Sequence, residues 1–175
     1  MEPDSCLYNL PVVLRLAGSL QTAALHRALQ EIVNRHEILR TTFTGNGEGP
    51  IQVIAVRQIL EMPVVKLSAP AGPALEAEVD RLIGQAIRPP FDLARGPLIR
   101  AVLLRLRAEV HVLVLTLHHI VCDAWSLNIL MRELAALYEG FTADQRAALP
   151  ELPVQYADFA HWQHRHLRGA VLEKQ

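Results

Sequence analysis

The sequence predicts an α/β (α+β) fold of two layers, in which helices cover a mixed β-sheet. Segments with apolar residues at helical spacing alternate along the chain with short aliphatic segments that resemble strands. Two of these strand-like segments, 98–106 and 110–117, are separated by three residues and predict an antiparallel hairpin. With 175 residues, 51% of them hydrophobic, the chain is long enough to form one domain with its own core.

The first third of the chain predicts a strand, a helix and a hairpin. The first strand is expected over 10–16, and a helix over 21–35 follows because its apolar residues recur on one side. Residues 35–43 are expected to contain the end of this helix and the start of a second strand. The turn over 44–50 contains three glycines and joins that strand to another over 51–56.

The rest of the chain predicts strands and helices in alternation. The expected elements are a short edge strand over 63–67, a helix over 75–86, the hairpin described above, a helix over 126–139, a loop over 142–153 and a last helix over 154–172. Pro89-Pro90 ends the second helix because proline lacks the amide hydrogen. Gly140 predicts the end of the third helix. The strand over 110–117 is apolar at odd and even positions, which is typical of a strand buried on both faces.

Composition excludes several classes of function. The formal net charge of −1 gives no general attraction for nucleic acid or for an anionic membrane surface. No apolar run approaches the roughly 20 residues of a membrane span, and the N-terminus lacks the features of a signal peptide. The two cysteines, Cys6 and Cys122, do not form a disulfide framework. We therefore expect a cytoplasmic protein that binds neither nucleic acid nor membrane.

Residues 118–126 link the most apolar strand to the third predicted helix and contain the chemically most informative residues. Successive side chains on a strand point to opposite faces, so His118 and His119 cannot share one task. One of them can face a cavity while the other points into the protein. Asp123 follows in the turn or at the helix start, where it can cap backbone N–H groups or orient a ring or a cation.

Taken alone, this pattern leaves several interpretations open. For His118, His119 and Asp123 by themselves, the favoured interpretation is a core histidine, a surface histidine and a helix cap. A metal site is less favoured, because the two histidines diverge and no spaced set of cysteines or histidines accompanies them. Thiol catalysis by Cys122 is not supported by any nucleophile motif around it.

Five segments, in order along the chain, resemble one family. The segment His118-His119-Ile120-Val121-Cys122-Asp123-Ala124 resembles a His-His-x-x-x-Asp-Gly signature. The other four are Tyr8-Asn9-Leu10-Pro11, Arg35-His36-Glu37-Ile38-Leu39-Arg40-Thr41-Thr42-Phe43, Pro90-Phe91-Asp92-Leu93 with Gly96-Pro97-Leu98, and Tyr156-Ala157-Asp158-Phe159-Ala160-His161-Trp162-Gln163. The chain resembles the condensation domain of nonribosomal peptide synthetases, which has a chloramphenicol-acetyltransferase-like fold.

The resemblance implies roles for the residues of the signature. His119 would face a tunnel between two lobes, where it positions or deprotonates the acceptor amine that attacks a donor thioester. Asp123 would be structural and would pair with Arg35. His118 would be packed inside the protein in a supporting role. No metal or cofactor is expected on this chain, whereas phosphopantetheine is expected on partner carrier proteins.

Four further residues are expected to support this site. Arg40 would assist the fold or form part of the tunnel wall. Ala124 stands where the signature has glycine, and its methyl group would either narrow access for the substrate or have no effect. Trp125 and Ser126 would open the following helix. Amide groups at that helix start would suit a developing oxyanion, although an ordinary helix start is an equally good interpretation.

The resemblance also implies partners and a domain assignment. Residues 1–175 would form the N-terminal lobe of a condensation domain, without the family's first motif and without the C-terminal lobe. The expected partners are peptidyl or acyl carrier protein domains, that second lobe and an adenylation domain of the same synthetase. Two alternatives remain: a non-catalytic fragment that docks a carrier protein or the second lobe, and a trimeric acetyltransferase-like enzyme. By itself the chain is expected to be inactive in condensation.

Overall fold

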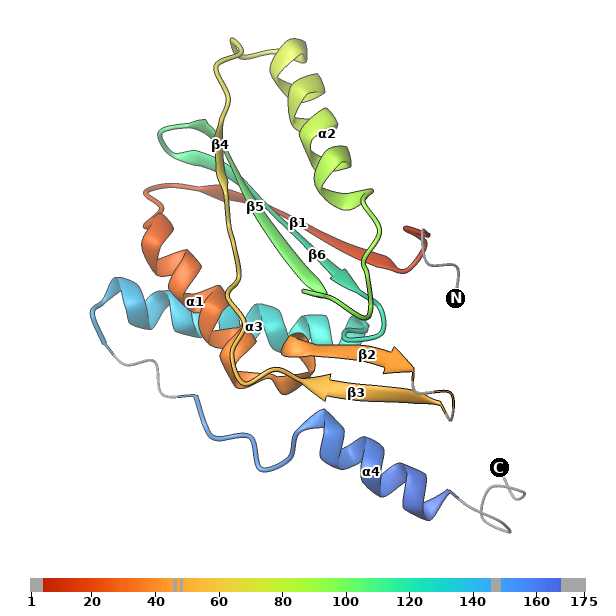
Figure 1. Cartoon of the computed structure of the whole chain (residues 1–175). Coiled ribbons are helices and arrows are strands. Elements are labelled where there is room, and N and C mark those ends of the chain that lie inside the picture. Colours follow the sequence, from red (N-terminus) through yellow and green to blue (C-terminus); the bar gives the residue numbers. More distant parts are fainter. Residues whose placement is uncertain (1–4, 46, 48, 146–148, 168–175) are drawn as a thin grey trace.

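The computed structural model describes residues 5–45, 47, 49–145 and 149–167. Figure 1 shows their arrangement. The elements, in chain order, are β1 (Asn9–Ala17), α1 (Thr22–Arg35), the 3₁₀ helix η1 (Glu37–Arg40), β2 (Thr41–Gly45), β3 (Pro50–Ile54), β4 (Val64–Lys66), α2 (Pro73–Ile87), β5 (Ile99–Arg107), β6 (Val110–His118), α3 (Ala124–Thr142) and α4 (Tyr156–His166).

Four strands form one mixed sheet in the order β1-β6-β5-β4. β6 pairs antiparallel with both β1 and β5, while β4 pairs parallel with β5. Pro11 is tolerated because β1 is an edge strand of this sheet. β2 and β3 form a separate antiparallel hairpin, as the glycine-rich turn between them predicts.

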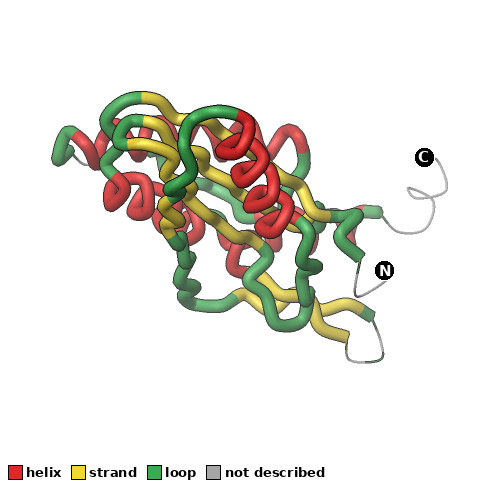
Figure 2. Tube along the Cα trace, turned by 90° about the horizontal axis from the view of Figure 1, so that it is seen from above, coloured by secondary structure: helices red, strands yellow, loops and turns green. Residues whose placement is uncertain are grey.

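Helices cover both faces of the four-stranded sheet, as Figures 1 and 2 show. α1 and α3 pack on one face, and the apolar side chains of this layer include Leu29, Ile32, Leu115, Leu130 and Leu134. α2 packs on the opposite face, where the buried residues include Leu75, Val79, Leu104, Val112 and Val114. The predicted mixed sheet covered by helices is confirmed, and α2 adds cover beyond the two layers expected. β6 supplies side chains to both cores, which explains its apolar sequence.

The C-terminal ends of α3 and α4 differ most from the predicted positions, while the other helix boundaries agree to within two residues. α3 runs through Gly140 to Thr142, because Phe141 packs against the core and carries Arg27 4.3 Å above its ring. α4 starts at Tyr156, two residues after the predicted start, and ends at His166. The predicted continuation of α4 over 168–172 lies outside the described residues.

A strap over 55–63 leads from β3 to β4 across α1. Two side chains of α1 hold it in place. The Nε2 atom of His26 lies 2.7 Å from the Leu60 carbonyl oxygen, and the Gln30 amide donates to the Gln58 carbonyl and accepts from the Leu60 N–H.

None of the helices in the described part of the chain is long and apolar enough to cross a membrane.

Candidate functional site

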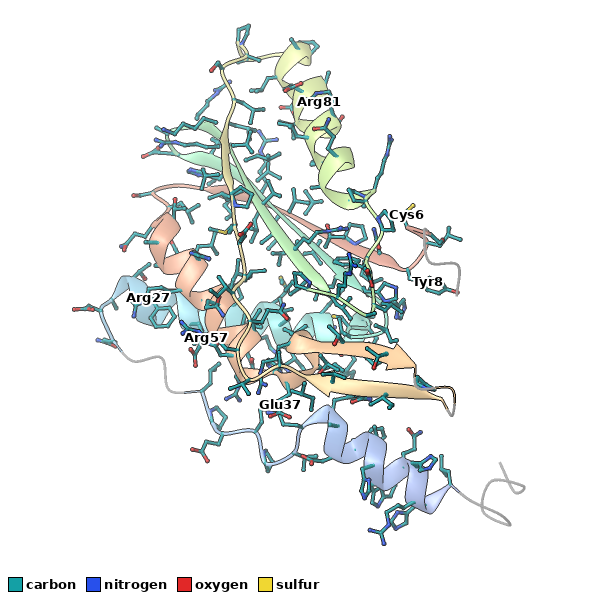
Figure 3. The ribbon with its side chains drawn as sticks, in the orientation of Figure 1. Cys6, Tyr8, Arg27, Glu37, Arg57 and Arg81 are labelled. Atoms are coloured by element: carbon teal, nitrogen blue, oxygen red, sulfur yellow. The ribbon has the colours of Figure 1, made fainter. Side chains whose placement is uncertain are left out.

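The two adjacent histidines diverge at the end of β6. β6 ends at His118, which is only 4% exposed, and His119 begins the following turn with its side chain in solvent. The alternation of a strand continues across this boundary because the His119 N–H still donates to the Tyr8 carbonyl at 2.8 Å. The predicted division between a buried and an accessible histidine is confirmed. Figure 3 labels Tyr8 beside the start of β1, where this turn meets the neighbouring strand.

His118 acts as an internal hydrogen-bond acceptor. Its Nδ1 atom accepts the Ile120 N–H at 3.0 Å, so Nδ1 carries no proton in this arrangement. The rings of Tyr8 and Phe91 lie 5.8 and 6.0 Å away, centroid to centroid. Burial, and to a smaller extent the neighbouring His119, lower the pKa of His118 below its ordinary value. The imidazole therefore stays neutral and fixes the turn that presents His119.

Asp123 caps the first turn of α3. Its Oδ1 atom accepts the Ser126 N–H at 2.8 Å and the Ser126 hydroxyl at 2.7 Å. These bonds, first the backbone one and then that of the side chain, lower the pKa of Asp123. The predicted ion pair between Asp123 and Arg35 is wrong, because in the structure each of these side chains binds another partner.

Arg35 instead bridges α1 to the middle of α3. Its Nε atom lies 3.2 Å from Oε1 of Glu133, and its guanidinium also donates to the Pro150 carbonyl. The other carboxylate oxygen of Glu133 lies 2.6 Å from Nε2 of His36. Glu133 is ten residues beyond Asp123 on α3, about 15 Å along the axis at about 1.5 Å per residue. A side chain that reaches Glu133 is therefore far from the signature aspartate.

Glu133 is a structural residue that the sequence analysis missed. It lies three residues after Leu130 and four before Leu137, both buried, so it falls on the inner stripe of α3. A carboxylate on such a stripe requires a partner, because an unpaired buried charge is costly. The Arg35-His36 pair at the end of α1 provides that partner. A charged residue within the apolar stripe was the feature of the sequence that could have indicated a buried ion pair.

The four expected supporting residues have different surroundings. Arg40 supports the fold, since its guanidinium donates to the Ala55 carbonyl and to Glu37 Oε1 at 3.1 Å. Trp125 is 77% exposed, and the adjacent Ala124 is also exposed, so neither side chain is part of the core beneath the turn. The Ser126 N–H is occupied by Asp123 and is not free for an oxyanion, contrary to one expectation above.

A small apolar pocket lies beneath the signature turn, between α1, η1 and the start of α3. It has a volume of about 100 Å³ and is lined by residues that include His36, Leu39, Val121, Cys122, Ser126 and Ile129. Burial raises the pKa of the Cys122 thiol to about 11, and the nearby Asp123 adds to the effect. The thiol is therefore protonated at neutral pH and poorly suited to act as a nucleophile. The described residues contain no cluster of three or more potential metal ligands.

The site thus presents one accessible imidazole, that of His119, on a turn whose backbone is held by hydrogen bonds. The His119 N–H binds the carbonyl of Tyr8, immediately before β1, while the His119 side chain is exposed. His118 and Asp123 each fix one end of the short turn that follows β6. An imidazole held in this way can orient an amine or accept a proton from it.

We expect Asp123→Ala to lower the melting temperature slightly, because α3 loses its N-terminal cap, whereas Asp123→Asn should retain most of the stability. The pKa of Asp123 is lowered in the fold, so its contribution is present above the unfolded pKa of about 3.9 and is lost as the pH falls through the lower folded value. Thermal scans should therefore separate wild type from Asp123→Ala at pH 7 and converge in acid. Equal melting temperatures at pH 7 would contradict the capping role.

Comparison with protein families gives a match over the whole chain. The model of the family described as "Condensation domain" matches residues 1–175. Chondramide synthase of Chondromyces crocatus is 47% identical over 174 residues, covering 99% of this chain and 4% of the synthase. A linear gramicidin synthase of Brevibacillus parabrevis is 44% identical over 175 residues, covering 100% of this chain and 3% of that protein. These relatives are nonribosomal peptide synthetases, of whose length the chain spans only a few per cent.

Solved structures agree with this match. The X-domain from teicoplanin biosynthesis, in its complex with OxyB, superimposes with a TM-score of 0.84 at 34% identity, over 95% of this chain and 35% of that one. The starter condensation domain of rhizomide synthetase superimposes with a TM-score of 0.84, over 97% of this chain and 40% of that one. At 21% identity, the second comparison shows the shared fold alone.

Proposed function

Because the chain belongs to the condensation-domain family, we propose that it forms the N-terminal lobe of a condensation domain that makes peptide bonds in a nonribosomal peptide synthetase. The observation that carries this proposal is the divergence of the histidine pair. His118 is buried and fixes the turn, and His119 is left accessible on the surface. This is the arrangement required of a single reacting imidazole.

In the proposed reaction, the amine of an acceptor aminoacyl thioester attacks the carbonyl carbon of a donor thioester. A C–N bond forms and the donor C–S bond breaks. The proton lost by the amine balances the one gained by the departing thiolate. His119 orients the amine and holds or accepts its proton, while phosphopantetheine arms on carrier proteins supply both thioesters. A thioester is already activated, so orientation accounts for much of the expected rate enhancement.

A second wall is needed for this chemistry, since His119 is open to solvent on its outer side. The chain spans 35–40% of the length of the condensation-domain structures it matches. We assign the missing wall to the C-terminal lobe of the same domain, which would exclude water and align the two thioesters. Carrier protein domains would then deliver the substrates, and an adenylation domain of the same cytoplasmic synthetase would load them.

The proposal predicts that the 175-residue chain alone gives no dipeptidyl product when it is mixed with loaded donor and acceptor carrier proteins. Product is expected when the C-terminal lobe of a condensation domain is supplied, either as a separate chain or fused to residue 175. Mass spectrometry of the acceptor carrier protein provides the measurement. If the chain alone formed product that depended on His119, the second-lobe requirement would be wrong and a site between protomers would be favoured.

A docking role is the second candidate function. It is supported by the X-domain relative, which was solved as a complex with OxyB. In the same experiment, this candidate predicts binding of a carrier protein but no product, even when the C-terminal lobe is present. Titration of labelled carrier protein, followed by fluorescence anisotropy, separates binding from turnover.

A further inference from the structure

The segment that follows α2 is clamped against the sheet at three carbonyl groups. The buried Asn9 side chain donates to the carbonyls of Ile87 and Pro89, at 2.6 and 3.0 Å. Arg100 on β5 donates to the carbonyls of Pro89 and Pro90, at 2.5 and 3.2 Å. These bonds fix the backbone up to Phe91, which is buried. Asn9 and Arg100 together form a clamp, which determines where the Phe91 ring lies.

The Phe91 ring lies between a cation and the buried histidine of the signature. The guanidinium carbon of Arg100 is 3.8 Å from the ring centroid, which is the geometry of a cation–π contact. The His118 ring stands almost perpendicular to Phe91, at an interplanar angle of 88°. Asn9 pairs with His118 in the β1–β6 register, so clamp and histidine meet at one end of the sheet.

We propose that Phe91 and Arg100 are positioning residues, which hold the His118 imidazole with Nδ1 toward the Ile120 N–H and so set the turn that presents His119. Phe91 fills the space beside His118, and Arg100 fixes Phe91 both by its ring contact and by the carbonyls on either side of Pro90. Arginine suits this role because its planar guanidinium can stack and donate at the same time. Lysine offers neither the plane nor the fork of donors.

The surroundings of His118 favour its neutral form. Tyr8 contributes a ring, His119 is the adjacent titratable group, and Arg100 brings a positive charge behind Phe91. Burial of the imidazole and, to a smaller extent, the adjacent His119 lower the pKa of His118. Only an unprotonated Nδ1 can accept the Ile120 N–H. Loss of the Arg100–Phe91 contact should therefore loosen this hydrogen bond before the rest of β6 is affected.

Nuclear magnetic resonance of the labelled 175-residue chain tests the inference with four variants. Arg100→Met removes the charge, the stack and the donors, Arg100→Lys retains only the charge, and Phe91→Leu retains an apolar side chain. Arg81→Met on α2 is the matched control, since Arg81 makes an exposed pair with Glu78. The readouts are the tautomer and pKa of His118 from imidazole ¹⁵N spectra, and hydrogen exchange of the Ile120 amide relative to that of Leu115.

We expect Arg100→Met and Phe91→Leu to accelerate Ile120 exchange about tenfold relative to Leu115, which corresponds to about 1.4 kcal/mol, and to raise the pKa of His118. Arg100→Lys should fall between these variants and wild type, and Arg81→Met should match wild type. If Arg100→Met does not fold, Arg100→Lys still gives the test. An unchanged tautomer and relative exchange rate, or equal acceleration at Ile120 and Leu115, would overturn the inference.

The inference deepens the proposed function, because it concerns how His119 is presented. Its failure is nevertheless distinguishable from failure of that function. The exchange measurement requires no carrier protein and no second lobe. The product assay depends on His119 itself, whose side chain is not part of the hydrogen bond between His118 and Ile120.

Discussion

Replacing His119 with alanine is expected to lower the rate of peptide-bond formation about 10²- to 10⁴-fold, the usual contribution of a positioned acid–base group. The assay requires the chain together with the C-terminal lobe and loaded carrier proteins. The loss should appear in the rate at saturating carrier protein, because His119 acts on the amine and not on docking. Stability should hardly change, since the side chain is exposed.

A matched control for this variant is His161→Ala, which removes another exposed histidine, on α4. It should leave the rate unchanged. The pH dependence of the residual activity separates the two roles proposed for His119. Raising the pH also deprotonates the acceptor amine in every variant, so the His119→Ala rate is compared with the His161→Ala rate at each pH. If His119 removes a proton, the ratio of the two rates should approach one as the pH rises, whereas a purely orienting role predicts a constant ratio. An unaltered rate in His119→Ala would rule out both roles.

Glu133→Ala is expected to lower the free energy of unfolding by about 1.5–3 kcal/mol, the range for hydrogen bonds to charged groups. The Glu133 side chain is 12% exposed and binds Arg35 and His36 through separate oxygens. Its removal leaves the Arg35 charge largely desolvated at the junction of α1 and α3. Denaturation in urea, followed by circular dichroism, gives the measurement.

Glu133→Gln provides the isosteric control for this prediction. It preserves shape and can still accept one hydrogen bond, so it should cost less than Glu133→Ala. The order of stability is therefore wild type, Glu133→Gln, Glu133→Ala. A Glu133→Ala protein as stable as wild type would show that the bridge between the helices contributes nothing.

The divergence of His118 and His119 could be predicted because it depends only on the two-residue period of a strand. Capping of α3 by Asp123 was one of the roles that its place before an amphipathic helix allowed, beside orienting a ring or a cation. The function of His119 did not follow from the residues alone, which favoured an ordinary surface histidine. Its assignment came from the resemblance.

The partner of Arg35 could not be predicted in the same way. Sequence spacing placed it at the end of a helix but did not show which carboxylate of a second helix would face it. That choice depends on how α1 and α3 pack, which places Glu133 and not Asp123 opposite the arginine. The end of α3 was missed for a related reason, because packing of Phe141 outweighs the helix-breaking tendency of Gly140.

The position of β6 has a consequence for how activity would be lost under stress. Local opening of a protein usually begins at edges and termini, where few contacts must be broken. β6, which ends at His118 and leads directly into His119, is bonded along its length on both sides and is buried on both faces. Mild heat or denaturant should therefore release the β2–β3 hairpin and α4 while the imidazole keeps its alignment. His119, the proposed reacting group, directly follows the strand that should open last, so we expect inactivation to coincide with global unfolding.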